Sequence, residues 1–377
     1  MAQEHAPKRL FAGSYTEDGG DAGIYTLAFD QAERRLRIER RSGCAPNPSF
    51  LALRNGMLYA AHELPDRGRV AAYAVQDDGS LVCRGACTSP SDAGTCHVAV
   101  HPSGRCLYGA DYESGSISCC TLAPDGSPSG GLPSVRHHGS GANRQRQASA
   151  HVHSTAFVPG TDVLAAVDLG IDEVVFYRTG ACGVLEQPPA ARVAVPAGSG
   201  PRMLAFHPRL RLAALVDELA NDVLLFRFDA AGLAWRPAGR LQLLDQTDGR
   251  GACAADGRAV LAAHPAFSPD GRRLYVSVRG LDEIVLFALD ENAAPTGRAA
   301  FPSGGRTPRH FSLSPDGSLL AVANQDSDEA VLFALDAASG APRELARLSL
   351  HRPSCIIWDA EAGHAGRVSD RMEPPNR

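Results

Sequence analysis

The clearest alternation of hydrophobic and polar positions lies at residues 306–336, RTPRHFSLSPDGSLLAVANQDSDEAVLFALD. PRHFSLS alternates over the length of one strand, and SPDG is a turn sequence in which glycine supplies the backbone freedom. SLLAVAN is apolar enough for a strand buried on both faces, and AVLFALD follows the polar turn QDSDE as a further strand. The stretch therefore predicts a three-stranded antiparallel meander.

The same pattern recurs about every 50 residues, which is typical of a repeat architecture. Seven units share it, at residues 9–30, 47–75, 95–122, 151–178, 200–229, 261–290 and 306–336. The variable segment after each unit is long enough for a fourth strand. The first unit lacks an opening strand, and the segment PSCIIW (353–358) has the right character to supply it.

A meander cannot bury both of its faces alone, so radial stacking of the units is the physical solution. We therefore predict an all-β fold, a seven-bladed β-propeller closed by pairing of its N- and C-terminal strands. Residues 1–377 are expected to form a single domain, with a short N-terminal arm (1–8) and a polar C-terminal tail (359–377). A β-sandwich would not need this period, and a solenoid would not need its last strand to complete its first unit.

Composition narrows the choice of partners. A formal net charge of −5 gives no reason to expect nucleic acid or an anionic membrane. Lys8 is the only lysine, so an anion site would have to use Arg, His or backbone amides. The start MAQEHAPKRL lacks the apolar segment of a signal peptide, no run of 18 apolar residues occurs, and the cysteines form no CxxC pair. These features predict a cytoplasmic protein with reduced cysteines.

Four residues stand at equivalent places in successive units. His153 and Arg202 precede their turns at the same spacing, in HSTAF and RMLAF, and Glu218 and Arg279 occupy equivalent later places. Because the innermost strand of each blade lines the channel, we expect the four side chains to meet at one channel mouth. His or Glu can accept a proton there, while Arg can hold a carboxylate, a phosphate or a developing oxyanion. An inter-blade ion pair between Arg279 and Glu218 is an equally physical arrangement.

Weaker candidates for substrate contact surround these four. They are His97, His151, Arg309 and Gln325, of which the last two face the channel of the final blade by the same spacing argument. Arg144 and Arg146 lie in a loop that can cover the pocket, and we expect their charges to be solvated. His151 and His153 are two residues apart on one strand, but no third and fourth ligand stands out, so neither a metal nor a cofactor is predicted.

The chain resembles the seven-bladed lactonase family, which includes propeller-type 6-phosphogluconolactonase and fungal carboxy-cis,cis-muconate cyclase. The specific motifs are HVHS, GPR, TPR and NQDSD, in that order and in successive units. Residues of the fungal cyclase that match His153, Arg202, Glu218 and Arg279 are its proposed active site, so the resemblance implies catalytic roles for these four. The chain departs from the family pattern at inner positions that include Met203 and His264.

The resemblance also implies a cofactor-independent hydrolase for a small lactone, 6-phosphogluconolactone above all, whose product 6-phosphogluconate belongs to the oxidative pentose phosphate route. His153 is the candidate general base, with Glu218 orienting it or acting as the base instead. A cyclase or lactonase for carboxylated muconates is the alternative within the family. A non-catalytic propeller that serves as a binding scaffold is the alternative outside it, although only two Trp are present to act as aromatic anchors.

Overall fold

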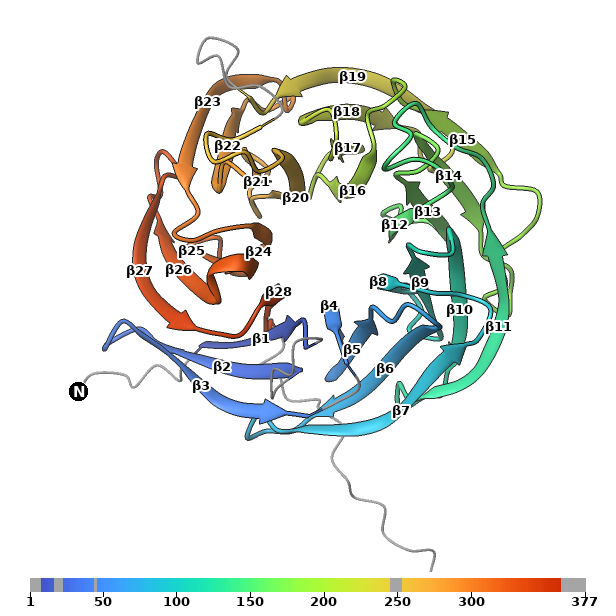
Figure 1. Cartoon of the computed structure of the whole chain (residues 1–377), viewed down its shortest axis with the longest axis horizontal. Helices are drawn as coiled ribbons and strands as arrows, with labels where there is room; N and C mark the ends of the chain where they lie inside the picture. The colour runs from blue at the N-terminus through green and yellow to red at the C-terminus, as the bar shows by residue number, and fades with distance from the viewer. Residues whose placement is uncertain (1–7, 17–22, 44–45, 245–252, 361–377) are drawn as a thin grey trace, which may run out of the picture.

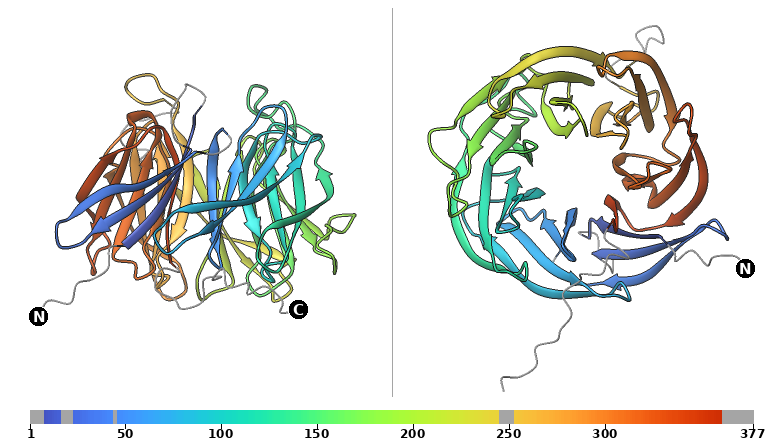
Figure 2. Two further views of the ribbon diagram at one scale, coloured as in Figure 1. Left: turned by 90° about the horizontal axis from the view of Figure 1, so that it is seen from below. Right: turned by 180° about the vertical axis from the view of Figure 1, so that it is seen from behind.

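The computed structural model describes residues 8–16, 23–43, 46–244 and 253–360. The predicted N-terminal arm and the predicted C-terminal tail lie almost wholly outside these described residues. Seven four-stranded antiparallel sheets stand in a ring around a central channel (Figure 1). Seen from the side and from behind, the strands of each sheet run between the two faces of the ring (Figure 2). The described residues contain no α-helix and only one short 3₁₀ turn, η2 (Gln325–Ser327), so the predicted seven-bladed β-propeller is confirmed.

Each sheet is one blade. The blades are numbered in chain order, and the strands of each blade are given from the innermost to the outermost. Blade 1 consists of β28 (Pro353–Trp358), β1 (Lys8–Ser14), β2 (Ile24–Asp30) and β3 (Arg35–Ser42), and blade 2 of β4 (Pro48–Arg54), β5 (Met57–His62), β6 (Gly68–Val75) and β7 (Leu81–Ser89). Blade 3 consists of β8 (Thr95–Val100), β9 (Cys106–Asp111), β10 (Ser116–Leu122) and β11 (Pro128–Arg136), and blade 4 of β12 (Val152–Phe157), β13 (Val163–Asp168), β14 (Glu173–Arg178) and β15 (Ala191–Ala194). Blade 5 consists of β16 (Pro201–Phe206), β17 (Leu212–Asp217), β18 (Asp222–Phe228) and β19 (Trp235–Gln242). Blade 6 consists of β20 (Leu261–Phe267), β21 (Arg273–Arg279), β22 (Glu283–Leu289) and β23 (Pro295–Pro302), and blade 7 of β24 (Pro308–Leu313), β25 (Leu319–Asn324), β26 (Glu329–Leu335) and β27 (Pro342–Ser349).

The ring closes through blade 1, as the sequence predicts. Strand β28 pairs antiparallel with β1, with Ile357 opposite Phe11 and Cys355 opposite Gly13. The indole of Trp358 donates a hydrogen bond to the carbonyl of Ser312 in blade 7 at 3.0 Å. The last strand of the chain therefore completes the first sheet and ties it to its neighbour, which removes two exposed sheet edges.

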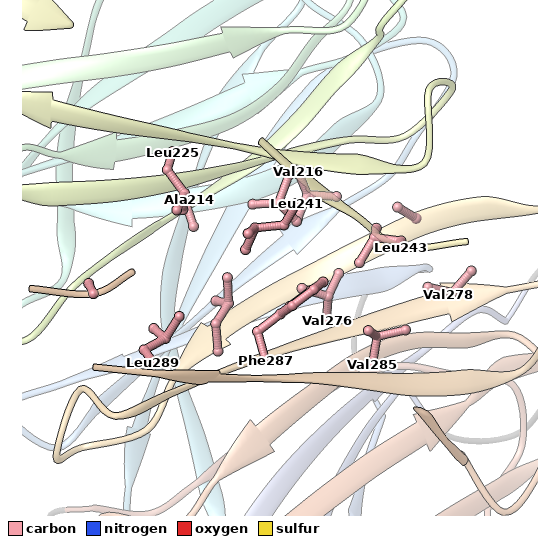
Figure 3. Packing of buried hydrophobic residues seen from close by; sticks show 14 of the residues in the cluster. Ala214, Val216, Leu225, Leu241, Leu243, Val276, Val278, Val285, Phe287 and Leu289 are labelled. Atoms are coloured by element: carbon pink, nitrogen blue, oxygen red, sulfur yellow. The ribbon is translucent and has the colours of Figure 1, made fainter. Parts of the chain in front are cut away.

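The hydrophobic core is divided among the interfaces between neighbouring blades. Seven clusters of buried residues are found among the described residues, one for each interface around the ring. Figure 3 shows the cluster between blades 5 and 6, where Val216 and Leu241 face Val276 and Phe287. The second strands, such as β17 and β25, are buried along their whole length because each of their faces packs against another blade. This explains why SLLAVAN is apolar at nearly every position.

Every innermost strand carries a β-bulge near its start. In each of six blades, one residue of the innermost strand has no partner on the second strand. We call these six the bulge residues: Ser354, Ser49, Cys96, His153, Arg202 and Arg309. In blade 6 the extra residue lies within the pair Ala263 and His264. A bulge frees one side chain from the alternation of the strand and re-aims it, and bulges are common next to active sites.

Candidate active site

A pocket lies at the end of the channel where the innermost strands begin. Its lining consists of the six bulge residues Ser49, Cys96, His153, Arg202, Arg309 and Ser354, together with Phe50, Met203 and His310, which directly follow a bulge residue. The empty space inside it, its open mouth included, is about 280 Å³. The bulges therefore turn one side chain from each of six blades toward a common space.

A second tier of side chains follows the second strands at the same end of the channel. Glu218 comes directly after β17, and Arg279 is the last residue of β21. The ends of these strands pair with the starts of the innermost ones, with Pro201 opposite Asp217 and Leu261 opposite Arg279. This pairing places Glu218 and Arg279 beside the bulge residues.

Glu218 is the centre of an ion-pair network drawn from three parts of the chain. Its Oε2 lies 2.9 Å from Nε of Arg202 and 2.7 Å from Nη2 of Arg279, and its Oε1 accepts a hydrogen bond from Nη2 of Arg146 at 2.6 Å. The Glu218 side chain is only 2% exposed. Burial by itself raises the pKa of this carboxyl, but Arg279 and Arg202 outweigh burial and hold the pKa well below its usual range. Glu218 is therefore a permanent anion at neutral pH.

The two inner arginines are fixed by backbone contacts as well. Arg202 donates from Nη1 to the carbonyl of Ala263 at 2.6 Å, and Arg279 donates from Nη2 to the carbonyl of Ala262 at 3.1 Å. Burial lowers the pKa of both guanidinium groups, and Arg279 lowers that of Arg202 further by repulsion. The inter-blade ion pair between Arg279 and Glu218 is thus present, and it belongs to a network that includes a pocket-lining arginine.

His153 lines the pocket next to this network. Its side chain is buried, and Nδ1 has no hydrogen-bond partner among the described residues. The ring edge of His153 meets the ring of Tyr112 at a centroid distance of 5.5 Å. Burial and the charge of Arg202 hold the pKa of His153 well below its ordinary value, so the imidazole is neutral at pH 7. A neutral imidazole can accept a proton, which is what the role of general base requires.

A second charged cluster occupies the opposite side of the channel. Tyr15 donates a hydrogen bond from its hydroxyl to Oε2 of Glu63 at 2.6 Å, and Arg309 lies 3.9 Å from the same oxygen. The guanidinium groups of Arg309 and Arg352 lie 5.3 and 5.5 Å from the centre of the Tyr15 ring. The sequence prediction includes Arg309 but misses Tyr15 and Glu63. Both directly follow a second strand, as Glu218 does, and that position was the available signal.

His97 lies one residue beyond a bulge and contributes to a layer of rings rather than to the pocket lining. Its ring packs on Phe50 at 4.1 Å, and Phe50 in turn meets His310 at 5.5 Å. The rings of His264 and His310 contact each other at a tilt of 43°, with 4.0 Å between their centroids. Burial lowers the pKa of His97 and that of His310 to about 3 each, so these rings are neutral and form an uncharged floor.

His151 and Gln325 are also outside the pocket lining. His151 stacks on Tyr112 at 4.4 Å and contacts the carbonyl of Tyr112 through Nδ1 at 2.8 Å. Gln325 lies in η2 and donates to the carboxylate of Asp326 at 3.1 Å. Substrate contacts by His97, His151 and Gln325 stay predictions.

The expectation of a solvated charge at Arg146 is wrong, because Arg146 pairs with Glu218. A loop residue gives no sequence signal for such a contact. In the described part of the chain no group of three or more His, Cys, Asp or Glu side chains is arranged to hold a metal ion. No helix there is long and apolar enough to cross a membrane.

Comparison with known proteins places the chain in a family. The model of the family described as "Lactonase, 7-bladed beta-propeller" matches residues 9–358. The chain therefore belongs to the seven-bladed β-propeller lactonases.

Individual relatives agree with this assignment. The chain is 30% identical over 312 residues to the 6-phosphogluconolactonase of Bacillus subtilis, across 80% of this chain and 83% of that protein. It is 29% identical over 244 residues to the 6-phosphogluconolactonase of Pectobacterium carotovorum, across 65% and 67% of the two chains. The structure of the periplasmic gluconolactonase of Pseudomonas aeruginosa superposes with a TM-score of 0.84 at 29% identity, across 94% of this chain and 99% of that one.

Proposed function

We propose that this protein hydrolyses 6-phosphogluconolactone to 6-phosphogluconate, with His153, Glu218, Arg202 and Arg279 as the catalytic group. The observation that carries the proposal is that a neutral buried imidazole and Arg202 line one pocket, and that Arg202 belongs to a network in which three guanidinium groups surround one carboxylate. Two positive charges of that network are uncompensated, which suits an anionic substrate and a developing oxyanion. The names of the Bacillus and Pectobacterium relatives support the choice of lactone.

In the proposed mechanism His153 takes a proton from a water molecule, whose oxygen attacks the lactone carbonyl carbon. Arg202 lines the pocket next to His153 and stabilises the negative charge that develops on the carbonyl oxygen. Arg279 adds to the positive electrostatic potential at that oxygen. Collapse of the tetrahedral intermediate breaks the ring C–O bond, and the leaving oxygen receives the proton from the His153 imidazolium. Glu218 keeps the arginines in place rather than acting as the base, because both of its carboxylate oxygens are already engaged by Arg146, Arg202 and Arg279.

The proposal needs only a small lactone as partner and water as co-substrate. We place the enzyme in the cytoplasm, and the nine cysteines of the described residues, all unpaired, support this placement. The Pseudomonas gluconolactonase is periplasmic, so location differs between this chain and that neighbour if the proposal holds.

A rate measurement tests the mechanism. Hydrolysis of 6-phosphogluconolactone, corrected for the spontaneous reaction, should fall about 10²–10⁴-fold in His153→Ala, because a general base contributes that much. His138→Ala is the control, since His138 is exposed in the segment that connects blades 3 and 4. A His153→Ala rate within about threefold of the wild-type rate contradicts the base assignment.

Carboxylated muconate lactones are the second candidate substrate. Two guanidinium groups, those of Arg202 and Arg309, line the pocket, and those of Arg146 and Arg279 join Arg202 at Glu218; this set matches a substrate that carries several carboxylates. Inhibition separates the two candidates, because inorganic phosphate should compete with the sugar lactone and tricarboxylates with the muconate.

A further inference from the structure

Residues 137–151, which we call the strap, connect blade 3 to blade 4 and bring Arg146 to Glu218. The strap is anchored by Gln147, whose side chain is completely buried. The Gln147 amide donates to the carbonyl of Leu169 at 2.8 Å and to Oδ1 of Asp172 at 2.7 Å, and its oxygen accepts from the amide of Asn143 at 2.8 Å. Gln147 is therefore fixed to blade 4, and this fixes the position of the neighbouring Arg146 backbone.

Arg146 differs from the other two partners of Glu218 in its exposure. Its side chain is 36% exposed, against 4% for Arg202 and 11% for Arg279. Arg202 and Arg279 also donate to backbone carbonyls, whereas Arg146 contacts two side chains, Glu218 and, at 3.5 Å, the hydroxyl of Tyr112. Arg146 is thus the most solvent-exposed member of the network and the one held by side chains alone.

Glu218 does not depend on Arg146 for charge balance. Arg146 contacts Oε1, while Arg202 and Arg279 both contact Oε2. Departure of Arg146 from Oε1 leaves the carboxylate with two cationic partners.

We propose that Arg146 determines specificity for phosphorylated lactones by turning from Glu218 to the substrate's phosphate group. This inference rests on the proposed function. A guanidinium group binds a phosphate through two parallel hydrogen bonds, and a phosphate dianion carries more charge than the single carboxylate that it replaces. The hydroxyl of Tyr112, already next to Arg146, is placed to donate to the same group.

The test compares 6-phosphoglucono-δ-lactone with glucono-δ-lactone, which lacks the phosphate. Arg146→Gln should lower kcat/KM for the phosphorylated lactone about 10- to 100-fold more than for glucono-δ-lactone, mainly through KM, because hydrogen bonds to charged groups are worth that much. Arg146→Lys should restore part of this preference, since Lys keeps the positive charge but cannot donate two parallel hydrogen bonds to the phosphate. Arg144→Gln is the matched control, because Arg144 is an exposed residue of the same strap.

Equal losses for both lactones in Arg146→Gln overturn the inference, because Arg146 would then act only through Glu218. If the wild-type protein hydrolyses neither lactone, the proposed function falls, and calorimetric binding of 6-phosphogluconate decides the inference separately. Weaker binding by Arg146→Gln than by the wild type supports it, and equal affinity overturns it.

Discussion

Replacing Glu218 by Gln removes the one negative charge from a group of three guanidiniums, of which those of Arg202 and Arg279 are buried. The carboxylate contacts them at 2.6, 2.7 and 2.9 Å. At an effective dielectric constant of about 20, each such pair is worth about 4 kcal/mol before desolvation is subtracted. Removing one partner from a buried ion pair costs about 3–5 kcal/mol in net stability, and we expect Glu218→Gln to reach that range. Arg146 can turn to solvent, but Arg202 and Arg279 cannot.

Urea unfolding followed by tryptophan fluorescence measures this loss as a decrease in the free energy of unfolding. Glu173→Gln is the control, because Glu173 forms a single ion pair with Arg192, also at 2.6 Å, in an exposed setting. An exposed pair contributes about 0–1 kcal/mol, so the control should stay within that range.

A further substitution separates charge repulsion from simple loss of packing. Adding Arg279→Met to Glu218→Gln removes one of the two trapped cations, so the double variant should be more stable than Glu218→Gln alone. The reasoning is refuted if Glu218→Gln lowers the free energy of unfolding no more than Glu173→Gln does. It is also refuted if the double variant is less stable than Glu218→Gln alone.

Three further predictions follow from the site and the fold. Because burial lowers the pKa of His153, kcat at saturating lactone should stay level between pH 7.5 and 6, whereas a histidine of ordinary pKa would give a roughly fourfold fall. The pKa of His310 is lowered to about 3 in the folded state, so its contribution to stability is present above pH 6.5 and is lost as the pH falls. Acidification from pH 7 to 5 should therefore lower the free energy of unfolding by about 2 kcal/mol through this residue. In urea titrations, His310→Leu should reduce the pH dependence of the free energy of unfolding by that amount. A chain ending at residue 360 should melt like the full chain, whereas one ending at residue 350 loses the buried Ile356 and Trp358 and should not fold cooperatively in calorimetry; equal melting temperatures would contradict the closure of the ring.

Repetition explains why so much of the fold is readable from the sequence. Each unit repeats the same order of alternating strand, turn and buried strand, so seven weak signals support one architecture. The same repetition brings out His153 and Arg202 as equivalent positions, and the structure shows that both are bulge residues. Their common direction depends on the bulge, which has no sequence signature of its own.

Contacts between non-equivalent positions are harder to predict. Arg309 and Glu63 come from blades 7 and 2, on either side of Tyr15 in blade 1, so their approach depends on the diameter of the ring. Arg146 reaches Glu218 from a strap whose path is set by the buried amide of Gln147. Neither contact follows from periodicity, because loop paths and channel width are properties of the assembled ring.

The bulges separate the lining of the pocket from the regular strand pairing of the blades. A bulge residue does not take part in the regular pairing of its strand, and the hydrophobic clusters lie between the blades, away from the pocket. The six bulge residues can therefore change identity with less effect on strand pairing than the regular positions of the same strands, although Arg202 is also held in the Glu218 network. Substitution at Ser49, Cys96 or Ser354 is the shortest route by which mutation could give this channel a new substrate.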